Sequence, residues 1–383
     1  MVEFDFQPRT RIVFGAGKLD KLGEFAAEIG ATRALVVSDA GVVAAGHTER
    51  GIQSLQAAGV DTLLFDAVHE NPTTVDVDAA VEVARDYGPD VLVGLGGGSS
   101  MDCAKGTNFL YTNGGRMQDY WGVGKATQPM LPMIAVPTTA GTGSEAQSFA
   151  LISDAETHTK MACGDKKAAC RLAILDPSLT VTQPARVTAV TGIDAIAHAL
   201  ETFVTKVRTP MSMAFSREAW RLLSTSFGRV LDDPDDLEAR GSMQLGACFA
   251  GMAIENSMLG AAHALANPLT AHYGVIHGEA VALMLPHVVR YNGHELADDY
   301  GSLLRLSFTI PEAPHPAEGP HGLSDFLSAL ARRAGLPQRL SERGVPPEAL
   351  PQLAQDAAQQ WTGTFNPRPV GEQELLAIYK QAM

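Results

Sequence analysis

The sequence predicts an α/β domain with an open, mostly parallel sheet over residues 1–183, followed by an all-α domain over residues 184–383. In the first half, short β-branched runs alternate with stretches of helical apolar spacing, as in a sheet covered by helices. The run 90–95 is continuously apolar after Asp90, which is typical of a parallel strand covered on both faces. Beyond residue 184 the period-2 pattern almost disappears, and long amphipathic stretches replace it.

In the predicted α/β domain, strands and helices follow one another in alternation. This order favours parallel strands joined by helical crossovers on both faces of one sheet. The last two predicted strands are also candidates for a hairpin. Strands are expected at 32–39, 61–66, 90–95, 133–137, 149–154 and 172–175, with helices at 51–59, at 75–87 and from Met101 onward.

In the predicted all-α domain, apolar residues recur with the spacing of helices that bury one face. The segment 309–321 is rich in proline and is predicted as a loop or surface linker. The helices are expected at about 186–206, 210–231, 235–254, 257–270, 279–292, 322–335, 347–360 and 371–382.

Composition excludes several classes of protein. A formal net charge of −14 repels polyphosphates, so neither nucleic acid nor an anionic membrane is expected as a partner. The chain lacks a run of about 18 apolar residues and an apolar N-terminal segment, so we expect neither a transmembrane helix nor a signal peptide. The four cysteines form no CxxC pair and are expected to be buried thiols in the reducing cytoplasm.

Two loops rich in glycine and small hydroxyl side chains follow buried strands. The loop 96–102 opens a helix, whose free N–H groups and dipole can bind a pyrophosphate. The loop 137–145 offers hydroxyl and backbone donors to a phosphate or ribose. A tight turn, and a helix cap at Ser144, are the alternative interpretations. Because the carboxyl ends of parallel strands share one edge, the two loops predict one crevice there.

Acidic and histidine side chains recur in an apolar part of the predicted helical domain. Asp194 and His198 are four residues apart, so they share one helix face. Among its apolar residues the segment 260–278 carries three histidines: His263, His272 and His277. A buried hydrogen bond would explain an isolated Asp/His pair, but several imidazoles in a dry core favour a bound ion. A carboxylate with imidazoles is a mixed donor set that suits Fe(II) or Zn(II).

These motifs resemble those of the iron-containing (group III) alcohol dehydrogenase family and occur in that family's order along nearly the whole chain. The resemblance implies the dehydroquinate synthase-like architecture, with a dinucleotide-binding domain, a helical metal-binding domain and an active site in the cleft between them. It also implies a homodimer or a higher homo-oligomer. The matching segments are GGGSSMDCAK (96–105), PTTAGTGSE (137–145), DPSLT (176–180), TGIDAIAHALE (191–201) and GAAHALANPLTAHYGVIHG (260–278).

The resemblance implies a metal-dependent oxidoreductase that transfers a hydride between NAD(H) and a small alcohol or aldehyde. The metal is Fe(II) in most relatives and Zn(II) in some, and it would act as a Lewis acid on the substrate oxygen. His277 is expected to act in catalysis as well as in metal binding. The family's metal ligands fall on Asp194, His198, His263 and His277.

The resemblance also implies the cofactor contacts. The family's ribose-selecting position falls on Asp39, where a carboxylate favours NAD over NADP; helix capping is the alternative function. Asp102 is expected near the nicotinamide, Lys160 on its ribose and Leu179 against the cofactor. The pyrophosphate would rest on Gly97, Gly98 and Ser99, with the hydroxyls of Thr138, Thr139, Thr142 and Ser144 around the adenine, ribose and phosphates.

The sequence departs from the family pattern at two positions. Asn267 stands where many relatives have a second histidine that is proposed to relay protons, and an amide cannot exchange protons near neutral pH, although it could hold a water or a ribose hydroxyl. Glu255 stands where relatives tend to be less charged. It is either a structural carboxylate or a polar group in the substrate pocket, where it could serve as a substitute base. Its spacing of eight residues from His263 suggests a similar helix face.

Three other functions compete with this interpretation. The nearest are glycerol dehydrogenase-like or dehydroquinate synthase-like enzymes, including polyol or hydroxy-acid dehydrogenases that use Zn(II). A metal-free maleylacetate reductase-like role is disfavoured because all four ligand positions are filled. A non-catalytic NAD-binding sensor would have had no reason to keep those ligands.

Overall fold

The chain folds into two compact units, which are described separately below. The computed structural model describes residues 3–157, 159–307 and 314–383. The α/β unit comprises Gln7–Gln183, and the helical unit comprises Pro184–Met383 together with Met1–Phe6. The described residues of that N-terminal segment therefore group with the helices, whereas the sequence analysis places them in the first domain.

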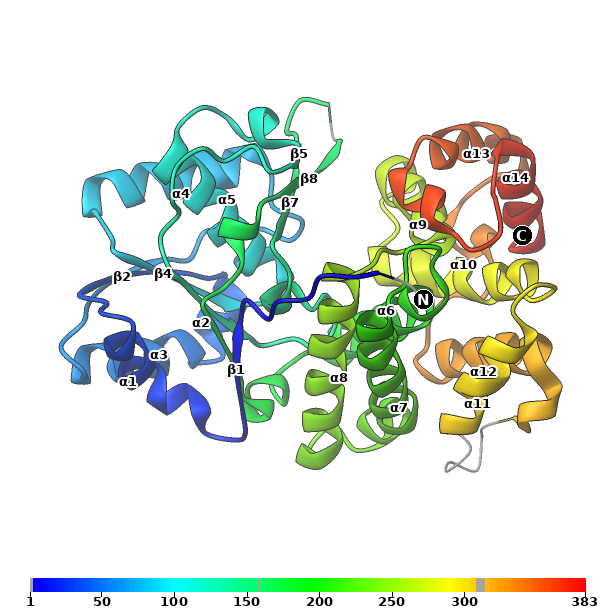
Figure 1. Cartoon of the computed structure of the whole chain (residues 1–383), viewed down its shortest axis with the longest axis horizontal. Helices are drawn as coiled ribbons and strands as arrows, with labels where there is room; N and C mark the ends of the chain where they lie inside the picture. The colour runs from blue at the N-terminus through cyan, green and yellow to red at the C-terminus, as the bar shows by residue number, and fades with distance from the viewer. Residues whose placement is uncertain (1–2, 158, 308–313) are drawn as a thin grey trace. The chain divides into compact units, whose positions relative to one another are not determined.

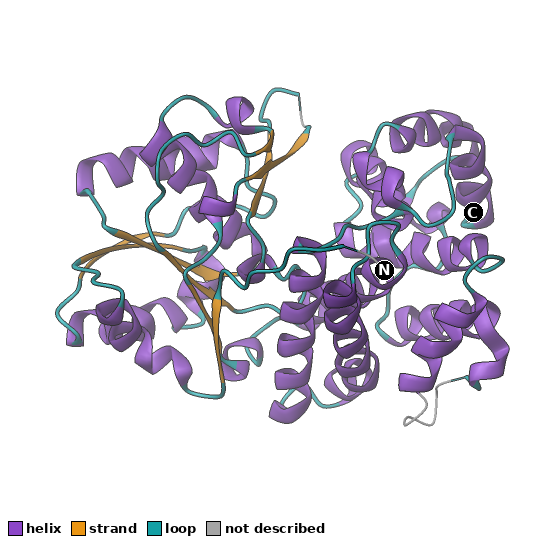
Figure 2. Ribbon diagram, in the orientation of Figure 1, coloured by secondary structure: helices purple, strands orange, loops and turns teal. Residues whose placement is uncertain are grey.

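The α/β unit is built on one sheet of six strands, all paired in parallel (Figure 2). The fold class predicted from the sequence is therefore confirmed. The order across the sheet is β1 (Arg11–Phe14), β9 (Leu172–Leu175), β6 (Met133–Pro137), β4 (Val91–Gly96), β2 (Arg33–Val37) and β3 (Asp61–Phe65).

Successive side chains of the central strands point to opposite faces of the sheet, and both faces are buried. The central strands are therefore continuously apolar. Leu35 and Val37 enter one core cluster, whereas Ala34 and Val36 enter the other. Helices cover the two faces of the sheet (Figure 1). The first cluster includes residues of α4 (Thr74–Tyr87) and α5 (Gly98–Asn113), and the second includes residues of α1 (Leu22–Glu28), α2 (Ala40–Ala44) and α3 (His47–Ala57).

The prediction of a hairpin between the strands at 149–154 and 172–175 is wrong. Strand β7 (Phe149–Ser153) pairs antiparallel with β8 (Lys160–Gly164), and both belong to a second sheet with β5 (Gly122–Val123). Strand β9 instead enters the main sheet between β1 and β6, because its four residues are all buried and need cover on both faces. The sequence analysis also missed β1, a half-exposed edge strand without a clear apolar pattern.

The second half of the chain is helical, as predicted. Helix α11 was not expected, and the predicted loop 309–321 ends inside α12; residues 309–313 lie outside the described residues. The helices are α6 (Ala185–Val204), α7 (Pro210–Asp232), α8 (Leu237–Glu255), α9 (Ala261–Tyr273), α10 (His277–Asn292), α11 (Ala297–Ser307), α12 (Gly319–Arg333), α13 (Leu350–Ala358) and α14 (Glu372–Gln381).

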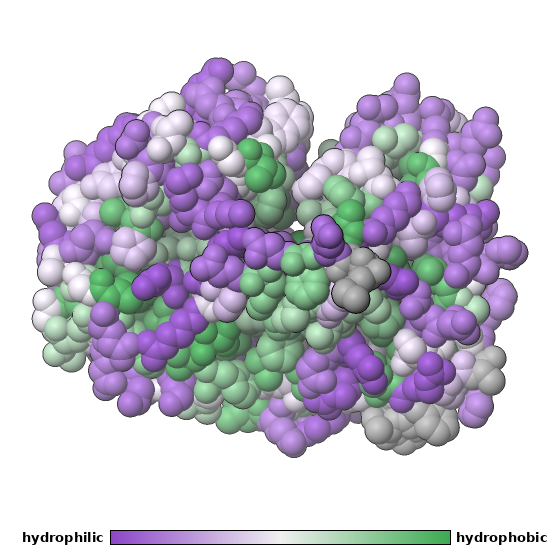
Figure 3. Space-filling model, viewed as in Figure 1, coloured by the Kyte–Doolittle hydropathy of each residue, from purple (hydrophilic) through white to green (hydrophobic). Residues whose placement is uncertain are grey.

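Helix α6 is the core helix of this unit and packs against α7, α8 and α10. By length and composition it is the one helix among the described residues that could cross a membrane, yet 89% of its apolar window is buried inside the protein. On the visible face of the molecule, hydrophilic residues are widespread and apolar residues are interspersed among them (Figure 3). The apolar character of α6 is therefore accounted for by its position in the core.

A glycine sets how closely α10 approaches α6. A methyl group at Gly278 would lie 2.1 Å from the carbonyl oxygen of Val190, which is far inside contact distance. Gly278 follows His277 at the start of α10, and Val190 precedes Asp194 on α6 by one helical turn. The close approach therefore brings the histidine at the start of α10 toward the acidic face of α6.

We expect Gly278→Ala to lower the free energy of unfolding by about 1–3 kcal/mol, because the added methyl overpacks the contact between α6 and α10. Urea denaturation of the purified variant measures this. Gly301→Ala is the matched control, since its helical methyl would lie 3.6 Å from its nearest neighbour. It should be neutral or stabilising by up to about 1 kcal/mol. Equal stability of the two variants would contradict the packing argument.

Candidate functional site

Four side chains from three helices of the helical unit form one cluster. Asp194 and His198 lie one turn apart on α6, His263 lies near the start of α9, and His277 is the first residue of α10. The first three are buried, whereas the His277 side chain is 23% exposed. The cluster therefore has a closed side within the core and a more open side at His277.

The distances in the cluster are close to those between ligands of one ion. The Oδ1 atom of Asp194 lies 3.5 Å from Nε2 of His198, 3.4 Å from Nε2 of His263 and 3.8 Å from Nε2 of His277. Tetrahedral coordination with bonds of about 2.0–2.2 Å would separate neighbouring donor atoms by about 3.3–3.6 Å. Donor atoms of Asp194, His263 and His277 all lie within 4.8 Å of one another.

Two atoms at the centre of this cluster are buried without a hydrogen bond. They are Oδ1 of Asp194 and Nε2 of His263, which face each other. A buried carboxylate oxygen and a buried imidazole nitrogen without partners would be costly in a folded protein. A divalent cation between them satisfies both, so the residues present fit a metal ion.

The electrostatics of the cluster agree with this assignment. Burial raises the pKa of the Asp194 carboxyl, but the imidazoles of His198, His263 and His277 outweigh burial and hold that pKa well below its usual range. Burial lowers the pKa of His263, but Glu201 and Asp194 outweigh burial and raise it to about 9. The field at this point therefore favours a positive charge, which a metal ion supplies.

Glu201 belongs to the same cluster and was missed by the sequence analysis. Its carboxylate is 3% exposed, and its Oε2 atom lies 2.5 Å from Nδ1 of His263. A signal was available, because Glu201 follows Asp194 by seven residues on α6 and thus lies on the same helix face. The sequence could not show that this face meets the start of α9.

In the α/β unit, the predicted nucleotide loops meet where the strand order reverses. The chain runs outward from β2 to β3, returns to β4 on the other side of β2, and continues to β6. Asp39 follows β2 and Ser100 lies in the first turn of α5; the Ser100 hydroxyl donates to Oδ2 of Asp39 at 3.0 Å. Ligands of open α/β sheets bind at such a reversal. Oδ1 of Asp39 also caps α2, accepting from two backbone N–H groups, Gly41 and Val42.

The two glycine and hydroxyl loops lie side by side, as the sequence predicts. A methyl group at Gly98 would lie 2.6 Å from Cγ2 of Thr142, and one at Gly97 would lie 3.4 Å from Cγ2 of Thr139. Gly97 is the N-cap of α5, so the first N–H groups of this helix face the edge of the sheet. Ser99 Oγ accepts a hydrogen bond from the backbone N–H of Asn71, at 3.2 Å.

A buried polar network joins the two loops. The Lys105 ammonium is fully buried and donates to the Ser144 carbonyl (2.6 Å), the Ser144 hydroxyl (2.8 Å) and the Phe149 carbonyl (3.0 Å). The Ser144 hydroxyl donates in turn to Asp102, at 2.7 Å. Burial raises the pKa of Asp102, although Lys105, Ser144 and Lys160 oppose that shift. Ser144 therefore links helix α5 to the second loop; it is not the cap of the following turn, because Gly143 occupies that position.

The remaining predicted cofactor residues differ in their burial and contacts. Lys160 is the first residue of β8 and is exposed. The backbone N–H of Thr138 donates to the carbonyl of Gly96 at 2.9 Å. Leu179 is fully buried in a core cluster of the α/β unit. The structure therefore brings Asp39, the two loops and Asp102 to one edge of the sheet and leaves Leu179 inside the core.

The structure also places the two residues that depart from the family pattern, Asn267 and Glu255. The side-chain amide of Asn267, on α9, donates to the Oε1 atom of Gln360 at 3.0 Å. Glu255 is the last residue of α8, and a loop separates it from α9, so helical spacing does not relate it to His263. His272 lies at the surface and pairs with Asp356 at 2.7 Å, away from the metal cluster.

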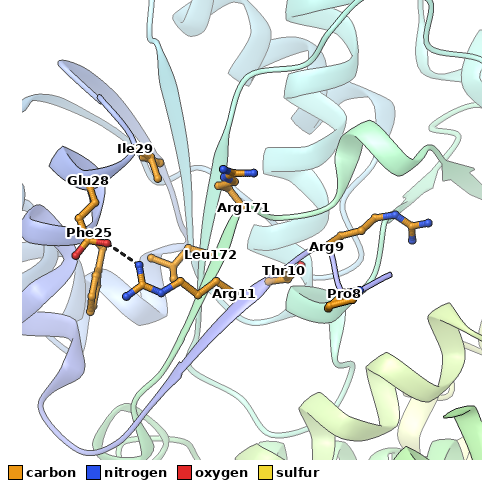
Figure 4. A pocket seen from close by; sticks show the side chains of 9 residues that line it. All are labelled: Pro8, Arg9, Thr10, Arg11, Phe25, Glu28, Ile29, Arg171 and Leu172. Atoms are coloured by element: carbon orange, nitrogen blue, oxygen red, sulfur yellow. Dashed lines mark hydrogen bonds and ion pairs between the residues drawn. The ribbon is translucent and has the colours of Figure 1, made fainter. Parts of the chain in front are cut away.

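A pocket at the other end of the sheet holds none of these residues (Figure 4). It lies at the amino ends of β1 and β9, whereas the glycine loops follow carboxyl ends. There Nη1 of Arg11 forms an ion pair with Oε2 of Glu28, at 2.5 Å. This pocket therefore lies apart from the predicted nucleotide edge. Its lining is Pro8, Arg9, Thr10, Arg11, Phe25, Glu28, Ile29, Arg171 and Leu172.

Comparison with known proteins agrees with this geometry. The profile of iron-containing alcohol dehydrogenases matches residues 8–177, and the profile of the C-terminal part of Fe-containing alcohol dehydrogenases matches residues 188–383. The chain belongs to the iron-containing alcohol dehydrogenase family. Enzymes of this family are NAD-dependent and bind iron, and the chain is an alcohol dehydrogenase.

Relatives of this dehydrogenase match it from end to end. The NAD-dependent methanol dehydrogenase of Bacillus methanolicus is 33% identical and covers 100% of both chains. The 1,3-propanediol dehydrogenase of Klebsiella pneumoniae is 33% identical over 99% of this chain and 98% of its own. Among solved structures, a 1,3-propanediol oxidoreductase superposes with a TM-score of 0.95 at 32% identity, covering 100% of both chains.

We expect Lys105→Met to destabilise the α/β unit by about 3–5 kcal/mol, because the acceptors around the buried ammonium lose their donor. It should also raise the KM for NAD+ more than it lowers kcat. Thermal unfolding and steady-state kinetics measure these effects.

Lys167→Met is the matched control for Lys105→Met. Its ammonium pairs with Asp165 at 3.2 Å, as that of Lys105 pairs with Asp102 at 4.0 Å, but the Lys167 side chain is 43% exposed. The loss of stability should stay within about 1 kcal/mol. Similar losses in both variants would show that the buried ammonium does not hold the loops together.

Proposed function

We propose that this dehydrogenase transfers a hydride between NAD(H) and a small alcohol or aldehyde, with Fe(II) held by Asp194, His198, His263 and His277. One observation carries the proposal: a buried carboxylate lies 3.4–3.8 Å from three imidazole nitrogens, with its own oxygen and the His263 nitrogen lacking hydrogen bonds. A divalent ion bound there supplies Lewis-acid polarisation of the substrate oxygen, and NAD supplies the hydride acceptor.

The helical unit would hold the ion rigidly. Two of its ligands come from one face of α6, and Gly278 lets the helix that begins with His277 approach α6 closely. The low exposure of Asp194, His198 and His263 shields these three side chains from water. His277 lies on the more open side, so we propose that substrate enters past this residue and that His277 orients it.

The α/β unit would bind the nucleotide at the reversal point of its sheet. We propose that the N–H groups of Gly98 and Ser99, at the start of α5, hold the pyrophosphate. Asp39 would accept hydrogen bonds from the adenosine ribose. Further contacts stay predictions for Gly97, Asp102, Thr138, Thr139, Thr142, Ser144, Lys160 and Leu179.

The proposal extends to two further residues, to the cell compartment and to the oligomeric state. A catalytic role of Glu255 and a place of Asn267 in proton transfer both stay predictions. Four buried free cysteines suit a reducing cytoplasm. Homo-oligomerisation also stays a prediction.

The main alternative is a polyol or hydroxy-acid dehydrogenase that uses Zn(II). One oxygen and three nitrogen donors suit Zn(II) as well as Fe(II), so the donor set leaves the metal open. Metal analysis of the purified protein, together with NADH oxidation on a panel of small aldehydes and ketones, separates the two.

Replacing a metal ligand should abolish both metal binding and turnover. We expect wild type to hold about one divalent ion per chain and His263→Ala to lose it, with activity reduced at least about a thousandfold. His272→Ala is the matched control, because His272 lies on the same helix but pairs at the surface with Asp356. It should keep metal and activity. Full wild-type activity in protein shown to be metal-free would refute the metal-dependent mechanism.

The charge at Asp39 should select NAD over NADP. We expect Asp39→Asn to raise the kcat/KM for NADPH relative to that for NADH, because the neutral amide no longer repels a 2′-phosphate. Asparagine caps helices as well as aspartate, so the melting temperature should change little. Asp39→Gly should shift preference in the same direction. A wild-type enzyme that prefers NADPH would show the assignment to be wrong.

A further inference from the structure

Glu201 connects the metal cluster to the start of α9 through both of its carboxylate oxygens. Oε2 accepts from the Nδ1–H of His263 at 2.5 Å, and Oε1 accepts from the backbone N–H of Ala262 at 2.7 Å. The side chain is 3% exposed, so these contacts are shielded from water. One buried carboxylate thus accepts hydrogen bonds from the ring of His263 and from the backbone of the residue before it.

The start of α9 is built around this carboxylate. The N-terminal end of a helix carries free N–H groups and favours negative charge. A methyl group at Gly260, the N-cap, would lie 3.0 Å from Oε1 of Glu201 and 3.1 Å from Oδ1 of Asn366. Asn366 accepts from the next N–H group, that of Ala261, at 3.3 Å. Glu201 and Asn366 therefore both accept from backbone N–H groups at the start of α9. Of these two side chains, Glu201 is the one that also contacts His263.

The contact with Glu201 determines which nitrogen of His263 is available to a metal. Because Nδ1 of His263 donates its N–H to the Glu201 carboxylate, the lone pair of the neutral ring is on Nε2. That atom faces Oδ1 of Asp194 at 3.4 Å and makes no hydrogen bond. A metal-binding histidine commonly donates its other N–H to a carboxylate, which fixes ring orientation and raises ligand basicity.

The charges also balance. A divalent cation with Asp194 as its one anionic ligand leaves a net charge of +1 in a buried site, and burial of uncompensated charge is costly. Glu201 supplies the second negative charge one imidazole away from the ion. A glutamine could not replace it, because its side chain has one acceptor oxygen for two donors.

We propose that Glu201 is the positioning residue of the metal centre: it holds His263 as the Nδ1–H tautomer with Nε2 toward the ion and neutralises the site. This inference rests on the proposed function, since it requires that the cluster bind a divalent metal. Glu201 acts through His263 and does not itself touch substrate or cofactor.

The test measures Co2+ binding to chelator-treated protein, through the visible absorption of tetrahedral Co2+ and by competition with a chelator. We expect wild type to bind one equivalent and Glu201→Gln to bind about 10–100-fold more weakly. Thermal unfolding without added metal shows that the compared proteins are folded.

Asn366→Ala is the matched control, since it loosens the same helix end without touching the imidazole. It should bind Co2+ within about threefold of wild type, well below the loss that follows removal of a ligand's partner. If Glu201→Gln does not fold, Glu201→Asp carries the test: it keeps the charge, retracts the acceptor, and should weaken binding about tenfold.

The outcomes separate the two proposals. If wild type itself binds no Co2+, the proposed metal function fails. If wild type binds Co2+ and the Glu201 variants bind equally well, the inference about Glu201 is overturned. The inference is also overturned if Asn366→Ala loses as much affinity as Glu201→Gln.

Discussion

The structure of the helical unit depends on one constraint: a buried carboxylate must be compensated. Asp194 lies within α6, the one helix among the described residues that is long and apolar enough to cross a membrane, and three imidazoles converge on it from α6, α9 and α10. Its Oδ1 atom and Nε2 of His263 lack hydrogen bonds, so the cluster is satisfied only when a cation joins it. The close packing of α10 on α6 and the use of glycine at position 278 both serve this convergence.

The α/β unit also depends on a buried charged side chain, which lies behind its predicted nucleotide-binding edge. Its sheet brings the ends of β2, β4 and β6 to one edge, and the free N–H groups at the start of α5 suit an anion there. Lys105 lies fully buried behind this edge and connects α5 with the second loop through Ser144. In both units a buried charge, Lys105 or Glu201, positions the groups that would contact cofactor or metal.

Much of the fold could be predicted because its determinants are local. The continuous apolar runs of β4 and β6 identify parallel strands, and the amphipathic stretches after residue 184 identify helices. The errors occur where pairing is not local. Strand β9 joins β1 and β6 rather than β7, its predicted hairpin partner, and β1 is a short edge strand whose identity depends on its partner. Periodicity describes which face is buried, not which strand covers it.

The sequence by itself determined the residue types that can ligate a metal and the spacing that places Asp194 and His198 on one helix face. It also determined the two glycine and hydroxyl loops at the ends of buried strands. Only the tertiary structure decided that Glu201 meets His263, that Lys105 joins the two loops, and that Glu255 lies on a different helix from His263. The physical reason is that helix periodicity is set by neighbouring residues, whereas a contact between helices depends on how whole faces pack.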